Sequence, residues 1–201
     1  YPSTINVSGV TGTVSKVTVT LAGLNHTYPA DVDILLVGPG GQSVILMSDA
    51  GSSGGNAGNL VNVNLTFDDT GAALPAAPQI VSGTYKPTDF EAGETFSSPA
   101  PAGLYGSTLS VFNGTNANGD WKLFVVDDTS GDTGSLAGGW SLTVATASTG
   151  PQPPTITAIA DQTTLTNTPT PALAFTINDA DTPIGSLTLS NASSNPTLVP
   201  T

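Results

Sequence analysis

Apolar and polar residues alternate with a period of two in several segments of this chain. In residues 14–21, valine and leucine side chains take one side and threonines the other. The same alternation runs through residues 61–67 and 140–144. Because successive side chains of a strand point to opposite faces, each segment is predicted to be a β-strand. The strand at 140–144 is predicted to have one solvated face.

One further predicted strand, residues 121–126, departs from this alternation. Trp121, Leu123 and Val125 would face one side. Phe124 and Val126, which would face the other side, are apolar too. Strands that are apolar on both faces are typically covered on both faces. This segment is therefore predicted to be a central strand.

Composition supports an all-β fold. The chain has 201 residues, of which 30 are Thr and 20 are Ser, while Lys, Arg and Glu together number five. Thr and Val suit strands, and the 23 glycines and 16 prolines suit turns. No segment reaches the roughly 18 apolar residues that a membrane span needs, so no membrane insertion is expected.

The charge balance excludes several kinds of partner and chemistry. Fifteen acidic side chains against three lysines give a formal net charge of −12. Nucleic acids and anionic membrane surfaces both require clustered basic residues, so neither is an expected partner. Without cysteine, the chain has no thiol nucleophile, disulfide or cysteine zinc site.

A change in composition divides the chain. Residues 147–154 are rich in proline and predict an extended linker between a first domain, residues 1–146, and a second, residues 155–201. Three short strands are predicted in the second domain, at 156–159, 172–177 and 187–189. This second segment is about half the length of an immunoglobulin-like sandwich, so it is either truncated or completed by a partner, and we favour truncation.

Two motifs carry a resemblance to a known family. In residues 26–41, a His-Thr pair precedes Asp31, an apolar strand and a Pro-Gly-Gly turn. Later in the chain, Gly119-Asp120-Trp121 leads into the apolar strand predicted at residues 121–126. Both resemble the P domain of proprotein convertases, also called the P/Homo B domain of subtilisin/kexin-like proteases. The resemblance covers about residues 4–146 and is nearest to the bacterial secreted versions.

The end of the first domain agrees with this resemblance. Residues 127–134 are rich in turn formers and, followed by the strand at 140–144, resemble the family's final hairpin. The resemblance implies an eight-stranded jelly-roll β-sandwich, similar to galactose-binding-like folds. In the second domain, residues 178–182 and 193–195 resemble tandem immunoglobulin- or cadherin-like repeats of bacterial adhesins.

The family's properties set the functional expectations. The P domain packs behind a subtilisin-like catalytic domain in convertases, and in bacteria it is attached to secreted proteases or large surface proteins. We therefore expect a secreted or cell-surface, monomeric accessory module whose partners are neighbouring domains of its parent chain, which the resemblance suggests is a serine-type endopeptidase or a large surface protein. A protein or glycan surface ligand is a further expected partner.

Catalysis by these 201 residues is not expected. A Ser-His-Asp relay would depend on His26, the one histidine, and no Gly-x-Ser-x-Gly motif is present. Hydrolytic zinc sites usually use two or three histidines. No pair of carboxylates is singled out as a glycosidase pair. His26 is instead expected to hydrogen-bond the loop that enters the strand near Asp31.

The aspartates suit a hard cation better. Calcium takes six to eight oxygen ligands from carboxylates and carbonyls. Asp31 and Asp33, two apart on a predicted strand, would point to the same face with α-carbons roughly 6.6 Å apart. In turns, by contrast, aspartate is favoured without any metal. The candidate calcium ligands are Asp31, Asp33, Asp49, Asp68, Asp69, Asp127 and Asp128.

Carbohydrate binding by a jelly-roll module of an adhesin is the alternative function. Trp121 and Trp140 lie in alternating strands and are expected in the core. The remaining aromatic residues considered fall in segments expected to be loops: Tyr28, Tyr85, Phe90, Phe96 and Tyr105. The segment Gly83 to Tyr105 would form either an exposed recognition loop or a cover over one sheet edge.

Overall fold

The computed structural model describes residues 1–51, 58–76, 79–91, 93–147, 150–151, 153–179 and 181–197. The chain divides into two compact units, Tyr1–Thr149 and Gly150–Thr201. Within the described residues, no helix is long and apolar enough to cross a membrane.

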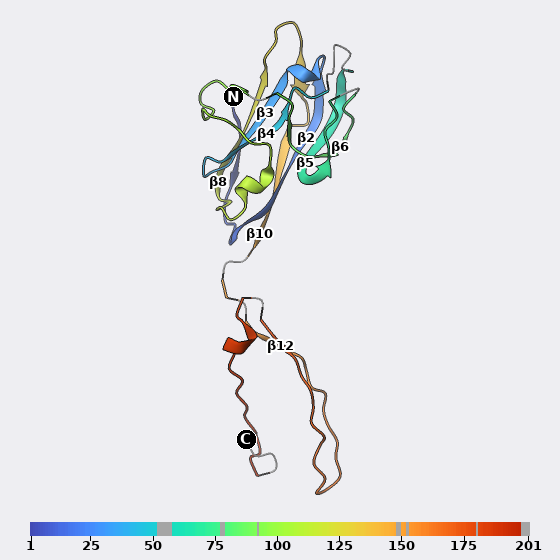
Figure 1. The fold of residues 1–201 in the computed structure, drawn as a ribbon, viewed down its shortest axis with the longest axis vertical. Coiled ribbons are helices and arrows are strands. Elements are labelled where there is room, and N and C mark those ends of the chain that lie inside the picture. The colour runs from blue at the N-terminus through green and yellow to red at the C-terminus, as the bar shows by residue number, and fades with distance from the viewer. Residues whose placement is uncertain are drawn as a thin grey trace. The chain divides into compact units, whose positions relative to one another are not determined.

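The first unit consists of two β-sheets in which most neighbouring strands are antiparallel (Figure 1). One sheet has the order β1-β8-β3-β4-β7, with bounds Ser3–Val7, Gly119–Asp127, Val32–Val37, Ser43–Ser48 and Thr88–Asp89. The other has the order β10-β2-β5-β6, with bounds Trp140–Ala147, Thr13–His26, Leu60–Ala72 and Gly83–Tyr85. A short strand, β9 (Gly134–Leu136), also pairs with β2. The predicted all-β sandwich of jelly-roll type is confirmed.

The main core lies between these two sheets. It takes the inward-facing side chains of β2, β5, β3, β4 and β8, and Trp121 and Phe67 are its largest fully buried members. The ring of Trp121 packs edge-on against Phe112 of the 3-10 helix η2 (Leu109–Phe112), with ring centroids 4.8 Å apart. The predicted two-residue alternation assigns the buried face of β2 correctly, and that of β5 at Val63, Leu65 and Phe67. It is wrong at Val61, which is 71% exposed while Leu60 is buried.

A second, smaller cluster covers the outer face of the first sheet. Leu35, Val37, Ile45 and Phe124 form it. Residues 93–106, here called the strap, pass over this face and pack their apolar side chains on the cluster. Strand β8 is thus covered on its inner face at Trp121 and Leu123 and on its outer face at Phe124, as predicted for a strand covered on both faces. Beyond that point its coverage ends, and Val125 is 41% exposed.

The final hairpin expected from the resemblance does not form. Strands β8 and β10 lie in different sheets, and β9 intervenes between them in sequence. The connection after β8 is fixed elsewhere: the Asp128 amide donates to the Asp31 carbonyl at 3.0 Å, and the Thr27 amide donates to the Thr133 carbonyl at 3.1 Å. These bonds direct the chain across the sandwich. Strand β10 then has the single solvated face that its alternation predicts.

The second unit has little regular structure among its described residues. Strands β11 (Thr155–Ile156) and β12 (Ile177–Asn178) form a two-stranded antiparallel sheet. The strand predicted at 187–189 is absent, and a 3-10 helix, η3 (Ile184–Ser186), precedes that segment. No described side chain of this unit is buried, so its apolar residues have no core to pack on. The immunoglobulin-like module stays a prediction.

Candidate metal site

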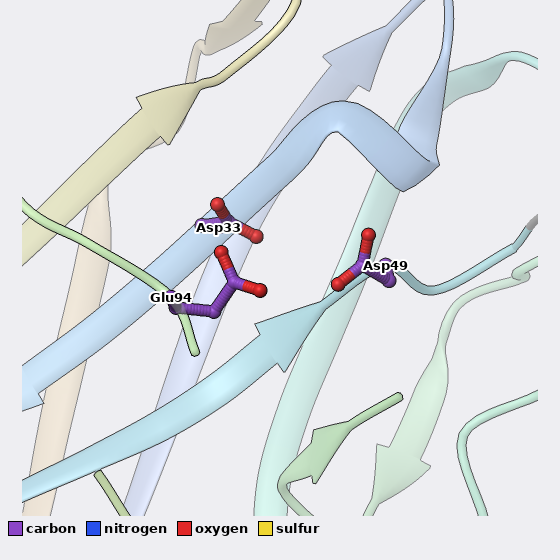
Figure 2. Close-up of side chains that lie close together, drawn as sticks. All are labelled: Asp33, Asp49 and Glu94. Atoms are coloured by element: carbon purple, nitrogen blue, oxygen red, sulfur yellow. The ribbon is translucent and has the colours of Figure 1, made fainter. Parts of the chain in front are cut away.

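Three carboxylates converge at one end of the first sheet. Asp33, Asp49 and Glu94 each offer one oxygen, and these three atoms all lie within 4.8 Å of one another. Figure 2 shows the three side chains pointing toward a common space from three separate segments. We call these three residues the acidic cluster.

Asp33 enters the acidic cluster from the middle of a buried strand. In β3, Val32, Ile34 and Leu36 face the main core. By the strand's alternation, Asp33 faces the outer side with Leu35, beneath the strap. Its side chain is consequently almost completely enclosed, and the residue is 3% exposed. A carboxylate buried to this extent requires a charged or hydrogen-bonding partner.

Asp49 is positioned by the turn that ends β4. Its φ of 51° lies in the left-handed region, which aspartate tolerates better than most residues with a β-carbon. The hydroxyl of the fully buried Ser48 donates to Asp49 Oδ2 at 2.9 Å. This bond fixes the orientation of the Asp49 carboxylate.

The third member comes from the strap. Strand β7 pairs in parallel with β4, so that Asp89 lies opposite Ser48. The chain leaving β7 is held there, because the Phe90 amide donates to the Ser48 carbonyl at 3.4 Å. Glu94 then projects from the start of the strap toward Asp33. Asp89 itself adds a buried Oδ1 atom that has no hydrogen-bond partner.

The electrostatics of the acidic cluster are strongly unfavourable to charge. Burial, followed by the neighbouring Glu94, raises the pKa of Asp33 to about 8. Burial is also the main cause that raises the pKa of Glu94 and of Asp89, and the negative charge of Asp49 adds to both. Without a cation, these carboxyl groups would share protons.

No lysine is bonded to the acidic cluster. Lys16 lies in β2 and pairs with Asp68 at 2.7 Å. Lys86 directly follows β6, and Lys122 lies within β8. The chain has no arginine. Neutralisation by a basic side chain is therefore not available where Asp33 is buried.

The donor set fits a calcium ion. Oxygen ligands bind calcium at 2.3–2.6 Å, so two oxygens on opposite sides of one ion lie about 5 Å apart. The three oxygens of the acidic cluster fall within that separation. Calcium also accepts irregular coordination, completed by carbonyl oxygens and water, whereas magnesium requires near-ideal octahedral geometry.

Of the seven aspartates predicted as ligands, Asp33 and Asp49 are brought together. Asp31 is not the strand neighbour that its spacing suggests, because it ends the 3-10 helix η1 (Pro29–Asp31). The prediction that Asp31 lies on the same strand as Asp33 is therefore wrong. Burial raises the pKa of Asp31, and the charges of Asp128, Asp132 and Asp127 raise it further.

Asp68 and Asp69 have protein donors. The Lys16 ammonium, then the Thr70 amide and hydroxyl, hold the pKa of Asp68 below its ordinary value. Asp69 caps η2 from a neighbouring strand: its two oxygens accept the amides of Leu109 and Ser110, each at 2.8 Å. Both carboxylates thus stabilise local backbone.

Asp127 and Asp128 lie where β8 ends. Asp127 Oδ2 is 3.3 Å from His26 Nε2, and the other ring nitrogen of His26 lies 2.8 Å from the Tyr28 carbonyl oxygen. The hydrogen-bonding role expected of His26 near Asp31 is confirmed. Asp128 is exposed and accepts the Thr129 hydroxyl at 3.2 Å.

The aromatic residues are mostly structural. Trp121 is fully buried and donates to the Ala117 carbonyl at 2.9 Å, and Trp140 packs against the main core. Tyr85, expected in a loop, instead lies in β6 and is buried at 9% exposure. Phe96 and Tyr105 pack against each other on the outer face of the first sheet. The strap is therefore a cover, but it covers the outer face of the first sheet and not the sheet edge that was predicted.

Glu94 is the member of the acidic cluster that the sequence analysis did not predict. It stands 45 positions after Asp49 in a segment without strand alternation. The one available signal was its rarity, since the chain contains two glutamates, Glu91 and Glu94, and both lie here. Only the path of the strap across the first sheet brings Glu94 to Asp33.

The fold and the acidic cluster define a two-sheet β-sandwich domain with a candidate cation site. No family profile matches the chain, and no curated protein matches it. Two solved structures of an Aeromonas sobria serine protease are similar. The protease in its complex with a chaperone is 15% identical, with a TM-score of 0.31, and the match covers 72% of this chain and 20% of that chain. The second structure of the protease is 16% identical, with a TM-score of 0.31, and the match covers 71% of this chain and 19% of that chain. This chain thus spans about a fifth of those protease chains.

Proposed function

We propose that residues 1–146 form a non-catalytic, calcium-stabilised β-sandwich module of P-domain type, which serves as an accessory or interaction domain in a larger secreted or cell-surface protein. The convergence of Asp33, Asp49 and Glu94 beneath the strap carries the calcium part of this proposal. The sequence resemblance over residues 4–146 supports the accessory role.

Calcium would stabilise this module by joining three segments that are distant in sequence. Asp33 belongs to β3, Asp49 follows β4, and Glu94 begins the strap. An ion bound to all three would favour the ionised carboxylates and hold the strap on the outer face of the sheet. Because unfolding separates these ligands, binding free energy would add to folding free energy.

Thermal melting with calcium or with a chelator tests this site. Calcium at 100 times its dissociation constant adds about 2.7 kcal/mol, which corresponds to roughly 5–11 °C for a domain of this size. The Glu94→Gln variant should lose most of that gain. Glu91→Gln is the matched control, because it removes the same charge from an exposed position three residues earlier.

Two results would contradict calcium binding at the acidic cluster. One is equal melting temperatures in calcium and chelator for the unaltered protein. The other is a calcium response that Glu94→Gln retains in full.

The accessory role has its own test. If the module stabilises a neighbouring catalytic domain of its parent chain, removing residues 1–146 from that parent should lower its yield of folded protein. The isolated 201-residue chain should show no peptidase activity on unfolded protein substrates. Turnover that disappears on His26→Ala would oppose the non-catalytic proposal.

No feature favours carbohydrate binding as a second proposal. The burial of Tyr85 removes one of the aromatic rings that could stack on a sugar. Phe96 and Tyr105 are engaged on the outer sheet face.

A further inference from the structure

A cavity opens between the two sheets where the main core ends. Its volume is about 330 Å³, at the lower end of the range for ligand pockets. Both sheets contribute apolar walls, with Leu21 and Leu24 from β2 and Ile34 and Val125 from β3 and β8. The 41% exposure of Val125 arises on this open face. The cavity is distinct from the acidic cluster, which lies on the opposite face of β3.

His26 forms a rigid polar wall of this cavity. The residue is 5% exposed, and both of its ring nitrogens are engaged, with Tyr28 and Asp127. Strand β9 pairs with β2 so that Gly134 lies opposite His26, and a β-carbon on Gly134 would stand 2.1 Å from His26 Cδ2. Glycine at this position therefore lets β9 close one side of the cavity.

The rim of the cavity is acidic. Asp127 lines the cavity beside His26. Asp31, Asp128 and Asp132 do not line it but lie close by, since the charges of Asp127, Asp128 and Asp132 all act on Asp31. Asp132 accepts the Thr27 hydroxyl at 2.9 Å, next to His26, and the Asp128 amide is bonded to the Asp31 carbonyl. No described lysine is paired with these four aspartates. Their negative charges therefore favour a cation at the mouth of an apolar cavity.

The spacing of the rim carboxylates disfavours a chelated metal ion. Among the described residues, three metal-ligating oxygens come within 4.8 Å of one another at the acidic cluster, and no such group forms at this rim. Dispersed carboxylates around an apolar cavity instead match a ligand that carries separate positive charges beside an apolar group.

We propose that this cavity and its acidic rim form a docking site for a basic peptide segment of a partner protein, with an apolar side chain inserted between the sheets and flanking lysines or arginines at the rim. Apolar insertion supplies most of the affinity at such sites, while complementary charge supplies orientation and association rate. The site does not depend on calcium binding.

Binding of a labelled peptide tests the proposal. The probe is fluorescein-labelled Gly-Lys-Leu-Lys-Leu-Lys-Gly, followed by fluorescence anisotropy at low ionic strength with calcium held constant. One comparison peptide has serine in place of leucine, and another has glutamate in place of lysine. The basic, leucine-containing peptide should bind more tightly than both.

One pair of variants tests the cavity. Val125→Trp places a large ring at the cavity mouth from the cavity-lining, 41% exposed Val125 of β8, and it should weaken binding at least about tenfold, equivalent to 1.4 kcal/mol. Ser141→Trp, on the solvated face of β10, is the matched control and should leave the affinity unchanged.

A second pair tests the rim. The double change Asp128→Asn with Asp132→Asn should weaken binding about fivefold, because each asparagine keeps one acceptor oxygen while the pair removes two charges. The control Asp120→Asn removes a charge at the other end of β8. Asp120 lies seven residues from Asp127 along β8, about 23 Å away at 3.3 Å per residue, and this control should bind normally.

Circular dichroism and melting curves establish that each variant is folded. Equal binding of the serine and leucine peptides would overturn the proposal, because it would reduce the effect to non-specific charge attraction. Unchanged binding by Val125→Trp would overturn the cavity as the site. Failure of the calcium test would leave these outcomes unaffected, since the two experiments use different residues.

Discussion

Asp33 occupies a position where an apolar residue would ordinarily pack. It shares the outer face of β3 with Leu35 and Val37, under an apolar strap, yet it is a carboxylate at 3% exposure. Burial of this kind destabilises the charged form and makes any compensating partner important. Two predictions at the scale of single residues follow from its position.

Replacing Asp33 by asparagine should have opposite effects with and without calcium. In chelator at pH 8, Asp33→Asn should raise the melting temperature, because it removes a buried charge while keeping a polar group beside Ser48 and Glu94. In calcium, Asp33→Asn should not raise the melting temperature above that of the unaltered protein. Melting curves in both buffers measure this, with exposed Asp120→Asn as the control. A lower melting temperature in chelator would show that the ionised carboxylate is stabilising by itself.

The benefit of calcium should grow with pH. The pKa of Asp33 is raised to about 8 in the folded protein, so this group makes the metal-free fold most stable below about pH 4. That contribution is lost as the pH rises toward 8, where the folded protein must also ionise. Bound calcium favours the ionised form, so its binding releases a proton below pH 8.

Measuring the calcium affinity at several pH values checks the direction of this pH dependence. Between about pH 5 and pH 8, the apparent affinity should rise by up to roughly tenfold per pH unit for one released proton, then level off. Isothermal titration in buffers of different ionisation enthalpy measures the proton count directly. A pH-independent affinity across this interval would contradict a protonated Asp33 in the metal-free protein.

At the scale of elements, the strap and η2 depend on contacts from distant segments. The strap covers Leu35, Val37, Ile45 and Phe124 without forming strands of its own. Helix η2 spans four residues and has no side-chain cap from its own N-terminal residue. Its first amides are bound instead by Asp69 of β5. These elements therefore derive their stability from tertiary contacts.

Loss of the Asp69 carboxylate should destabilise the first unit. Asp69→Ala leaves the amides of Leu109 and Ser110 without their acceptors, at a cost of about 1–2 kcal/mol. Asp69→Asn retains one acceptor oxygen and should lie between Asp69→Ala and the unaltered protein. Denaturant unfolding in calcium measures the difference. Equal unfolding midpoints for all three proteins would show that water replaces the Asp69 contacts without cost.

The sequence predicts regular strands well and irregular elements poorly. Alternation in residues 14–21 and 140–144 identifies β2 and β10 and their buried faces. The same approach placed Asp31 in a strand, although the chain there forms a 3-10 turn beginning at a proline. It also missed Glu94, because the strap follows the shape of the sheet beneath it. No local periodicity encodes such a path.

At the scale of the whole molecule, the two units differ in how they can be stabilised. Every buried residue among the described positions belongs to the first unit. The Pro-rich segment was visible in the sequence, whereas the sparse structure of the second unit was not. Its alternating apolar residues predicted strands, but strands need a packing partner to persist. Ile156 and Leu189 remain about 60% exposed.

Cooperative unfolding should therefore report on the first unit alone. At about 0.7 kcal/mol per residue near 60 °C, residues 1–147 would unfold with an enthalpy of about 100 kcal/mol, against about 140 for 201 cooperative residues. Calorimetry of the full chain should give the lower value. A chain ending at residue 147 should melt at the same temperature, and a clear decrease would show that the second unit stabilises the first.

The placement of the three lysines has a consequence for proteolysis. In a chain without arginine, trypsin-like enzymes can cleave only after lysine, and the Lys86 bond is protected because Pro87 follows it. Lys122 lies inside β8 and is paired with both β1 and β3, while Lys16 lies in β2 and is paired with β10. Cleavage at either site requires these central strands to open, which demands nearly global unfolding. The rate of tryptic digestion is thus a direct measure of how often the whole sandwich opens.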